Sequence, residues 1–125
     1  MSLCSQSDIA RLEEQYGVCL PEIYKSFLLG SHPNVEKALV GTDMDMRYLP
    51  ELRDWAQDML EESGSSFRLA STDFVFLMHQ GYQFMYFPCD DSDDPPVFYY
   101  MEGQPAPQKK FERFSAWLAL CEEEG

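Results

Sequence analysis

Residues 74–87 read FVFLMHQGYQFMYF, two apolar runs that flank His79, Gln80 and Gly81. Both runs are rich in aromatic and β-branched residues, which favour a pleated, half-buried surface, so the stretch predicts a β-hairpin. A two-residue loop centred on Gln80-Gly81 fits poorly, because the favoured types want glycine first or positive φ at both positions. A three-residue loop from His79 to Gly81, with Gly81 left-handed, suits the glycine better. Both faces of the second run are apolar, so we expect the hairpin mid-sheet and covered from both sides.

Apolar residues recur at helical spacing before and after this hairpin. The predicted helices cover residues 5–17, 21–30, 49–64 and 111–121. Ser5 and Asp8 form a capping pattern at the first start, and Pro21 suits the first position of the second helix because its missing N–H costs nothing there. Strands are predicted near Leu39-Val40, at a sheet edge from Phe67 to Leu69, and from Val97 to Met101.

Helices, then an antiparallel sheet, then a closing helix are the order of an α+β fold. The 125 residues suit one domain and contain no dividing linker, so we expect a single domain over residues 1–125. No apolar stretch approaches the roughly 20 residues that cross a bilayer, and residues 1–30 lack a signal-peptide pattern. The four cysteines form no C-x-x-C pair, which suits reduced thiols in the cytoplasm.

The formal charge of −13, with only nine Lys and Arg residues, restricts the kinds of partner that the protein can bind. Binding to phosphates needs basic residues that displace counterions, so we expect neither nucleic acid nor an anionic membrane as a partner. A strongly acidic domain attracts a basic protein quickly. The simpler interpretation, that the charge only keeps the protein in solution, stays open at this point.

His79 and Cys89 are the residues that a catalytic interpretation would use, as base and nucleophile. Cysteine–histidine catalysis needs a thiolate promoted by a nearby base, whereas Cys89 precedes four aspartates that disfavour a thiolate. No phosphate-binding loop, serine-nucleophile or zinc-protease motif is present. We therefore expect His79 to be a residue of the hairpin turn, and the protein to be neither an enzyme nor a cofactor-binding protein.

The densest charge is the run DDSDD, residues 90–94. As a calcium loop starting at Asp91 it fails, because prolines occupy the fifth and sixth positions, where a ligand and a glycine are needed. The same prolines stiffen the loop, which suits a protein-recognition element, while an ordinary solvated connection stays open as the alternative. Asp43-Met44-Asp45 resembles a metal-binding pair only superficially, and Glu61-Glu62 suits a solvated helix face. We expect no metal site.

The opening stretch IARLEEQYGVCLPEIYKSFLLGSHPN, residues 9–34, resembles the signature of the SUKH superfamily. The matching positions are Gly17, Leu20, Pro21, Tyr24, Phe27 and Leu28. The stretches HQGYQF, DDPPVFYY and FERFSAWL resemble the same family's sheet and closing helix. The resemblance implies a domain without a shared catalytic set. Many bacterial members are immunity proteins that neutralise a cognate toxin, often a nuclease, and others are related to fungal regulators of cell-wall synthesis.

The sequence thus predicts a cytoplasmic protein-binding domain, with an immunity protein as the first interpretation and a regulatory or scaffold adaptor of the cell-wall-regulator type as the alternative. In the first case an acidic surface would occlude the basic groove of a toxin domain. The expected partner-binding residues are Asp90, Asp91, Asp93, Asp94, Asp43 and Asp45.

Overall fold

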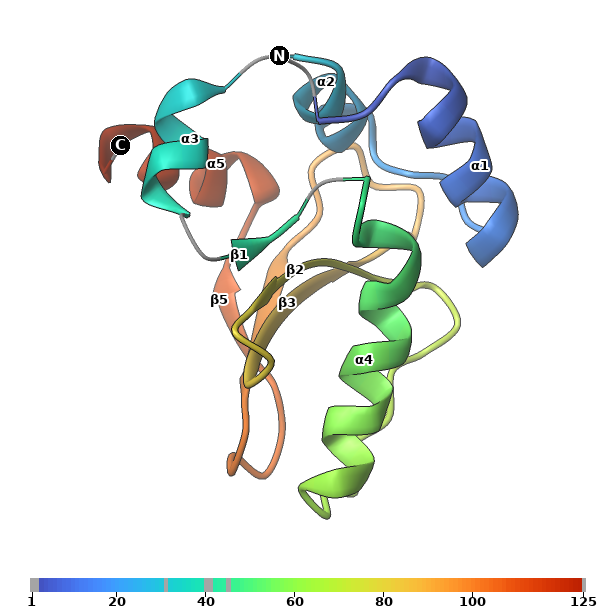
Figure 1. Cartoon of the computed structure of the whole chain (residues 1–125), viewed down its shortest axis with the longest axis vertical. Helices are drawn as coiled ribbons and strands as arrows, with labels where there is room; N and C mark the ends of the chain where they lie inside the picture. Colours follow the sequence, from blue (N-terminus) through green and yellow to red (C-terminus); the bar gives the residue numbers. More distant parts are fainter. Residues whose placement is uncertain (1–2, 31, 40–41, 45, 125) are drawn as a thin grey trace.

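The structure is a computed structural model that describes residues 3–30, 32–39, 42–44 and 46–124 (Figure 1). Its helices are α1 (Gln6–Tyr16), α2 (Glu22–Leu29), α3 (Pro33–Ala38), α4 (Leu49–Glu62) and α5 (Phe114–Glu124). Its strands are β1 (Thr42–Asp43), β2 (Asp73–His79), β3 (Gln83–Pro88), β4 (Val97–Met101) and β5 (Gln108–Phe111). The strands form one antiparallel sheet in the order β1-β2-β3-β4-β5, so the α+β prediction is confirmed.

Helices cover both faces of the central hairpin, as its two apolar faces predict. Successive side chains of a strand point to opposite faces. Met78 of β2 therefore faces Met59 of α4, while its neighbour Leu77 lies beside Trp117 of α5. The long helix α4 runs along one face of the sheet, and α5 packs on the opposite face together with α2 and α3 (Figure 1).

The core on the α5 side is built from aromatic rings. Tyr24 of α2 is 1% exposed, and its ring centroid lies 5.5 Å from that of Phe74 and 5.5 Å from that of Phe114. Phe76 is an extra residue on β2, because Val75 pairs with Tyr86 while Leu77 pairs with the preceding Met85. Such a bulge bends the strand and redirects a side chain. The Phe76 ring reaches that of Phe114 at 5.4 Å.

The hairpin turn combines features of the two predicted loops. His79 pairs with Gln83, so three residues, Gln80 to Tyr82, lie between the paired positions. The Tyr82 N–H donates to the His79 carbonyl at 3.2 Å, and φ is positive at both Gln80 (52°) and Gly81 (79°). The left-handed Gly81 is confirmed, but the predicted boundaries are one residue early. Gln80 takes the second positive φ, which is uncommon for a residue with a Cβ.

Two local predictions are wrong because a longer-range contact decides the structure, and a third is wrong at Leu39, where the N–H donates to the Val35 carbonyl at the end of a helix. Residues 67–69 form no strand: the Leu69 N–H donates to the Gln57 side chain at 3.4 Å instead of to a neighbouring strand. Phe111 lies in β5, opposite Val97, so the last helix begins three residues later, at Phe114. Leu39 ends α3, a helix that the sequence analysis did not predict, and Val40 lies outside the described residues.

Candidate functional site

The acidic loop, residues 90–94, joins β3 to β4 and lies against the first turn of α2. The Ile23 N–H donates to the Asp93 carbonyl at 3.3 Å, which fixes the loop backbone to that helix. Inside the loop, the Asp90 side chain accepts the Ser92 N–H at 3.3 Å. Asp90, Asp91 and Asp93 are exposed, so their carboxylates lie on a backbone that is held in place.

Asp94 differs from its neighbours because its carboxylate is bound to the first turn of α5. One oxygen accepts the Ser115 N–H at 2.9 Å, and the other accepts the Ser115 hydroxyl at 2.6 Å. The Phe114 N–H donates to the Pro95 carbonyl at 2.7 Å. The first N–H groups of a helix have no partner within the helix, and here Asp94 and the adjacent Pro95 supply two of these partners. Asp94 thus joins the loop to the closing helix.

The remaining predicted residues do not join this loop. Asp43 lies in β1, opposite Met78, whereas Pro88, which leads into the loop, pairs with Asp73 at the other end of β2. Met78 and Asp73 are five positions apart along β2, or about 17 Å at about 3.3 Å per residue. Asp45 lies outside the described residues. The structure therefore places Asp43 in a second, separate acidic surface.

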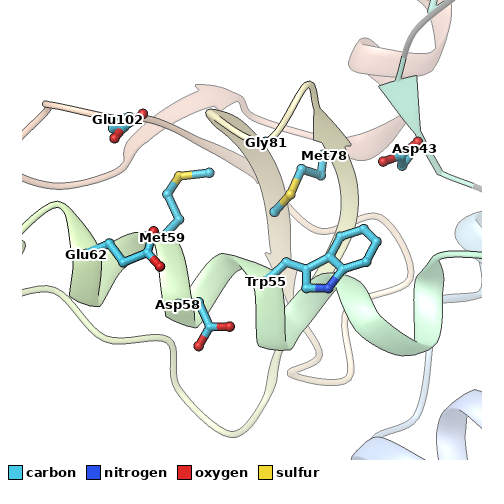
Figure 2. Close-up of a pocket in the computed structure, with 8 residues that line it drawn as sticks. All are labelled: Asp43, Trp55, Asp58, Met59, Glu62, Met78, Gly81 and Glu102. Atoms are coloured by element: carbon cyan, nitrogen blue, oxygen red, sulfur yellow. The ribbon is translucent and has the colours of Figure 1, made fainter.

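That second surface is a hollow of about 400 Å³ between α4 and the turn end of the sheet, called the acidic groove from here on (Figure 2). Asp43 and Glu102 lie at its opposite ends, with Glu62 and Asp58 along the α4 side. The apolar side chains of Trp55, Met59 and Met78 line the hollow between these acids. The lining residues are Asp43, Trp55, Asp58, Met59, Glu62, Met78, Gly81 and Glu102.

No lysine or arginine lines the acidic groove within the part of the chain that the structure describes. The ion pairs found between described residues use Asp8, Glu22, Glu112 and Glu122, so the four groove acids take part in none of them. Four carboxyl groups thus surround a partly apolar hollow without a cationic side chain. This arrangement suits a positively charged organic group.

Most of the groove cannot be recognised in the sequence, although part of its signal is present there. Trp55, Asp58, Met59 and Glu62 recur at intervals of three and four residues, which places them on one face of a helix. The sequence alone predicts a solvated face for Glu62. The groove becomes visible only when β1 and the end of β4 are brought to that face of α4.

His79 and Cys89 lie at opposite ends of the central hairpin. His79 pairs with Gln83, and Cys89 follows β3 at its far end, six residues further on, or about 20 Å. The His79 Nδ1 is hydrogen-bonded to the Thr42 hydroxyl at 2.8 Å. Burial, together with the charges of Asp73 and Asp90, raises the pKa of Cys89 to about 12. This geometry does not form a cysteine–histidine pair, and the Cys89 thiol stays protonated at neutral pH.

Comparison with known proteins identifies the family. A SUKH family model, described as SMI1-KNR4 cell-wall, matches residues 6–118. The chain belongs to the SUKH superfamily. The match spans every element from α1 to β5 and the first part of α5, so this SUKH domain accounts for most of the chain. No curated protein and no solved structure matches it.

The described residues of this SUKH domain include no group of three metal-ligating side chains that could hold a metal ion. Among the described residues, no helix has the length and apolar character that a membrane span needs.

Proposed function

We propose that this SUKH domain is a cytoplasmic immunity protein that binds a cognate toxin and neutralises it without catalysis, by covering the toxin's basic substrate groove. The observation that carries the proposal is the acidic loop: three exposed aspartates on a backbone held by α2 at one point and by α5 at another. A toxin that cleaves nucleic acid needs a basic groove to bind phosphates, and such a groove complements this loop.

The anchoring supports this function on physical grounds. A loop that is already ordered loses little conformational freedom on binding, so more of the interaction energy is left for affinity. Its charges, together with the net charge of −13, accelerate encounter with a basic surface. Both effects favour the rapid, tight capture that neutralisation of a toxin requires.

The test is the association rate with the toxin, which is sought in the gene next to this one. The variant Asp90→Asn/Asp91→Asn/Asp93→Asn removes three charges and leaves the Asp94 anchor. Its matched control, Glu51→Gln/Asp54→Asn/Glu61→Gln, removes three charges from exposed positions of α4. We expect about tenfold slower association for the loop variant at low salt, and less than threefold for the control. Equal slowing by both variants would remove the loop as the recognition element.

A second function, a regulatory or scaffold adaptor without a toxin partner, is favoured by the description of the matching family, SMI1-KNR4 cell-wall. Gene deletion distinguishes the two functions. Loss of the immunity protein sensitises cells to the neighbouring toxin alone, whereas loss of a cell-wall adaptor sensitises them to wall-targeting antibiotics in the absence of any toxin.

A further inference from the structure

We infer that the acidic groove is a binding site for a guanidinium group, that is, for an arginine side chain presented by a protein partner. The groove is a different surface from the acidic loop, and the inference rests on the proposed function only in that both expect a basic protein partner. Its volume of about 400 Å³ is near the lower end of the ~300–1,000 Å³ typical of small-ligand sites. The groove therefore suits one long side chain.

The apolar part of the groove fits the stem of that side chain. Met59 and Met78 are 6% and 3% exposed, so their side chains form an apolar floor, while Trp55 is only half-buried. The Trp55 ring also packs against Tyr48, with centroids 6.2 Å apart, which holds the indole in position. An arginine stem can pack on the two methionines while its flat guanidinium stacks on the indole face.

The charged part of the groove selects the occupant. Asp58 and Glu62 lie one helical turn apart on α4, and Asp43 and Glu102 approach from β1 and from the end of β4. A guanidinium donates five hydrogen bonds in fixed directions, so it can reach carboxylates on more than one side. It also relieves the repulsion between acids that have no cation among the described residues.

An arginine fits this groove better than a lysine does. The lysine ammonium is a compact and strongly hydrated charge, which loses more hydration when it enters a partly apolar hollow and cannot stack as a plane on Trp55. The inference therefore predicts an order of affinity, arginine above lysine, that general attraction between opposite charges does not produce.

The experiment is a titration of the ¹⁵N-labelled full chain with tetra-arginine and tetra-lysine peptides, followed by NMR. We expect saturable shifts of the Trp55 indole N–H, and little change at the indole of Trp117, which is 2% exposed. Tetra-arginine should bind at least threefold more tightly than tetra-lysine. Trp55→Leu keeps an apolar floor without the flat ring, and should bring the two affinities to within a factor of about 1.5.

Charge-matched variants locate the site. Asp58→Asn/Glu62→Gln/Glu102→Gln should weaken tetra-arginine binding at least tenfold, whereas the loop variant Asp90→Asn/Asp91→Asn/Asp93→Asn, with the same net charge, should weaken it less than threefold. All substituted side chains are exposed, and the same spectra report whether each variant is folded. Equal weakening by both variants, or equal affinity for the two peptides, overturns the inference. Because no toxin is used, such a result leaves the proposed immunity function standing.

Discussion

Replacing Asp94 by alanine should destabilise the whole domain, although Asp94 belongs to a loop of exposed acids. Its carboxylate accepts two hydrogen bonds from Ser115, at 2.9 Å from the N–H and 2.6 Å from the hydroxyl. Loss of a helix cap costs about 1 kcal/mol, and loss of a hydrogen bond to a charged acceptor costs about 1 kcal/mol more at this half-exposed position. We therefore expect Asp94→Ala to lower the free energy of unfolding by about 2 kcal/mol.

Urea unfolding followed by circular dichroism measures this change, provided that the slope of the transition is the same for both proteins. The control is Asp90→Asn/Asp91→Asn/Asp93→Asn, which should stay within about 0.5 kcal/mol of the parent because exposed charges contribute little. The double variant with Ser115→Ala should show a coupling of about 1 kcal/mol between the two positions. An Asp94→Ala effect no larger than that of the control would refute the anchoring role.

Three further predictions concern two buried groups and the half-buried Cys89. Phe27 is 3% exposed, so Phe27→Ala should lower the free energy of unfolding by about 3–5 kcal/mol, and a change below about 1 kcal/mol would place it outside the core. The Tyr24 hydroxyl is buried without a hydrogen-bond partner among the described residues, so Tyr24→Phe should raise stability by about 1 kcal/mol in the same assay; a loss of stability would reveal a partner. Because burial raises the pKa of Cys89 to about 12, iodoacetamide at pH 8 should modify Cys89 about a thousandfold more slowly than an ordinary thiol, after the exposed Cys19. Mass spectrometry of the labelled peptides checks the order, and equal labelling would contradict it.

The central hairpin could be predicted because its signal is local: two apolar runs, a glycine between them and apolar residues on both faces. The same holds for α1, where Ser5 and Asp8 exchange hydrogen bonds at the start and Gly17, with φ 65°, ends the helix. Details that depend on distant partners could not be predicted. The spacing of Phe111 and Phe114 fits a helix, but Phe111 pairs with Val97 and therefore lies in β5.

The two acidic surfaces also differ in how much of each can be predicted from the sequence. Residues 90–94 are contiguous, so their density is visible in the sequence, although the contact of Asp94 with Ser115 is not. The groove draws on β1, α4, the hairpin turn and the end of β4, and no short stretch contains more than a part of it. The spacing of Trp55, Asp58 and Glu62 is compatible with one face of α4, but it carries no information about which other acids that face meets.

The two hydrogen bonds between Asp94 and Ser115 also have a consequence for sequence change in the acidic loop. Three of its aspartates can be substituted independently, whereas Asp94 cannot. Under the proposed immunity function, a lineage whose toxin changes can alter Asp90, Asp91 or Asp93 in single steps, because none of these side chains is hydrogen-bonded to another element in the described structure. Change at Asp94 needs a compensating change at Ser115. The three exposed positions of the loop can thus change while its attachment to α5 stays the same, which would favour the proposed immunity function when the toxin also evolves.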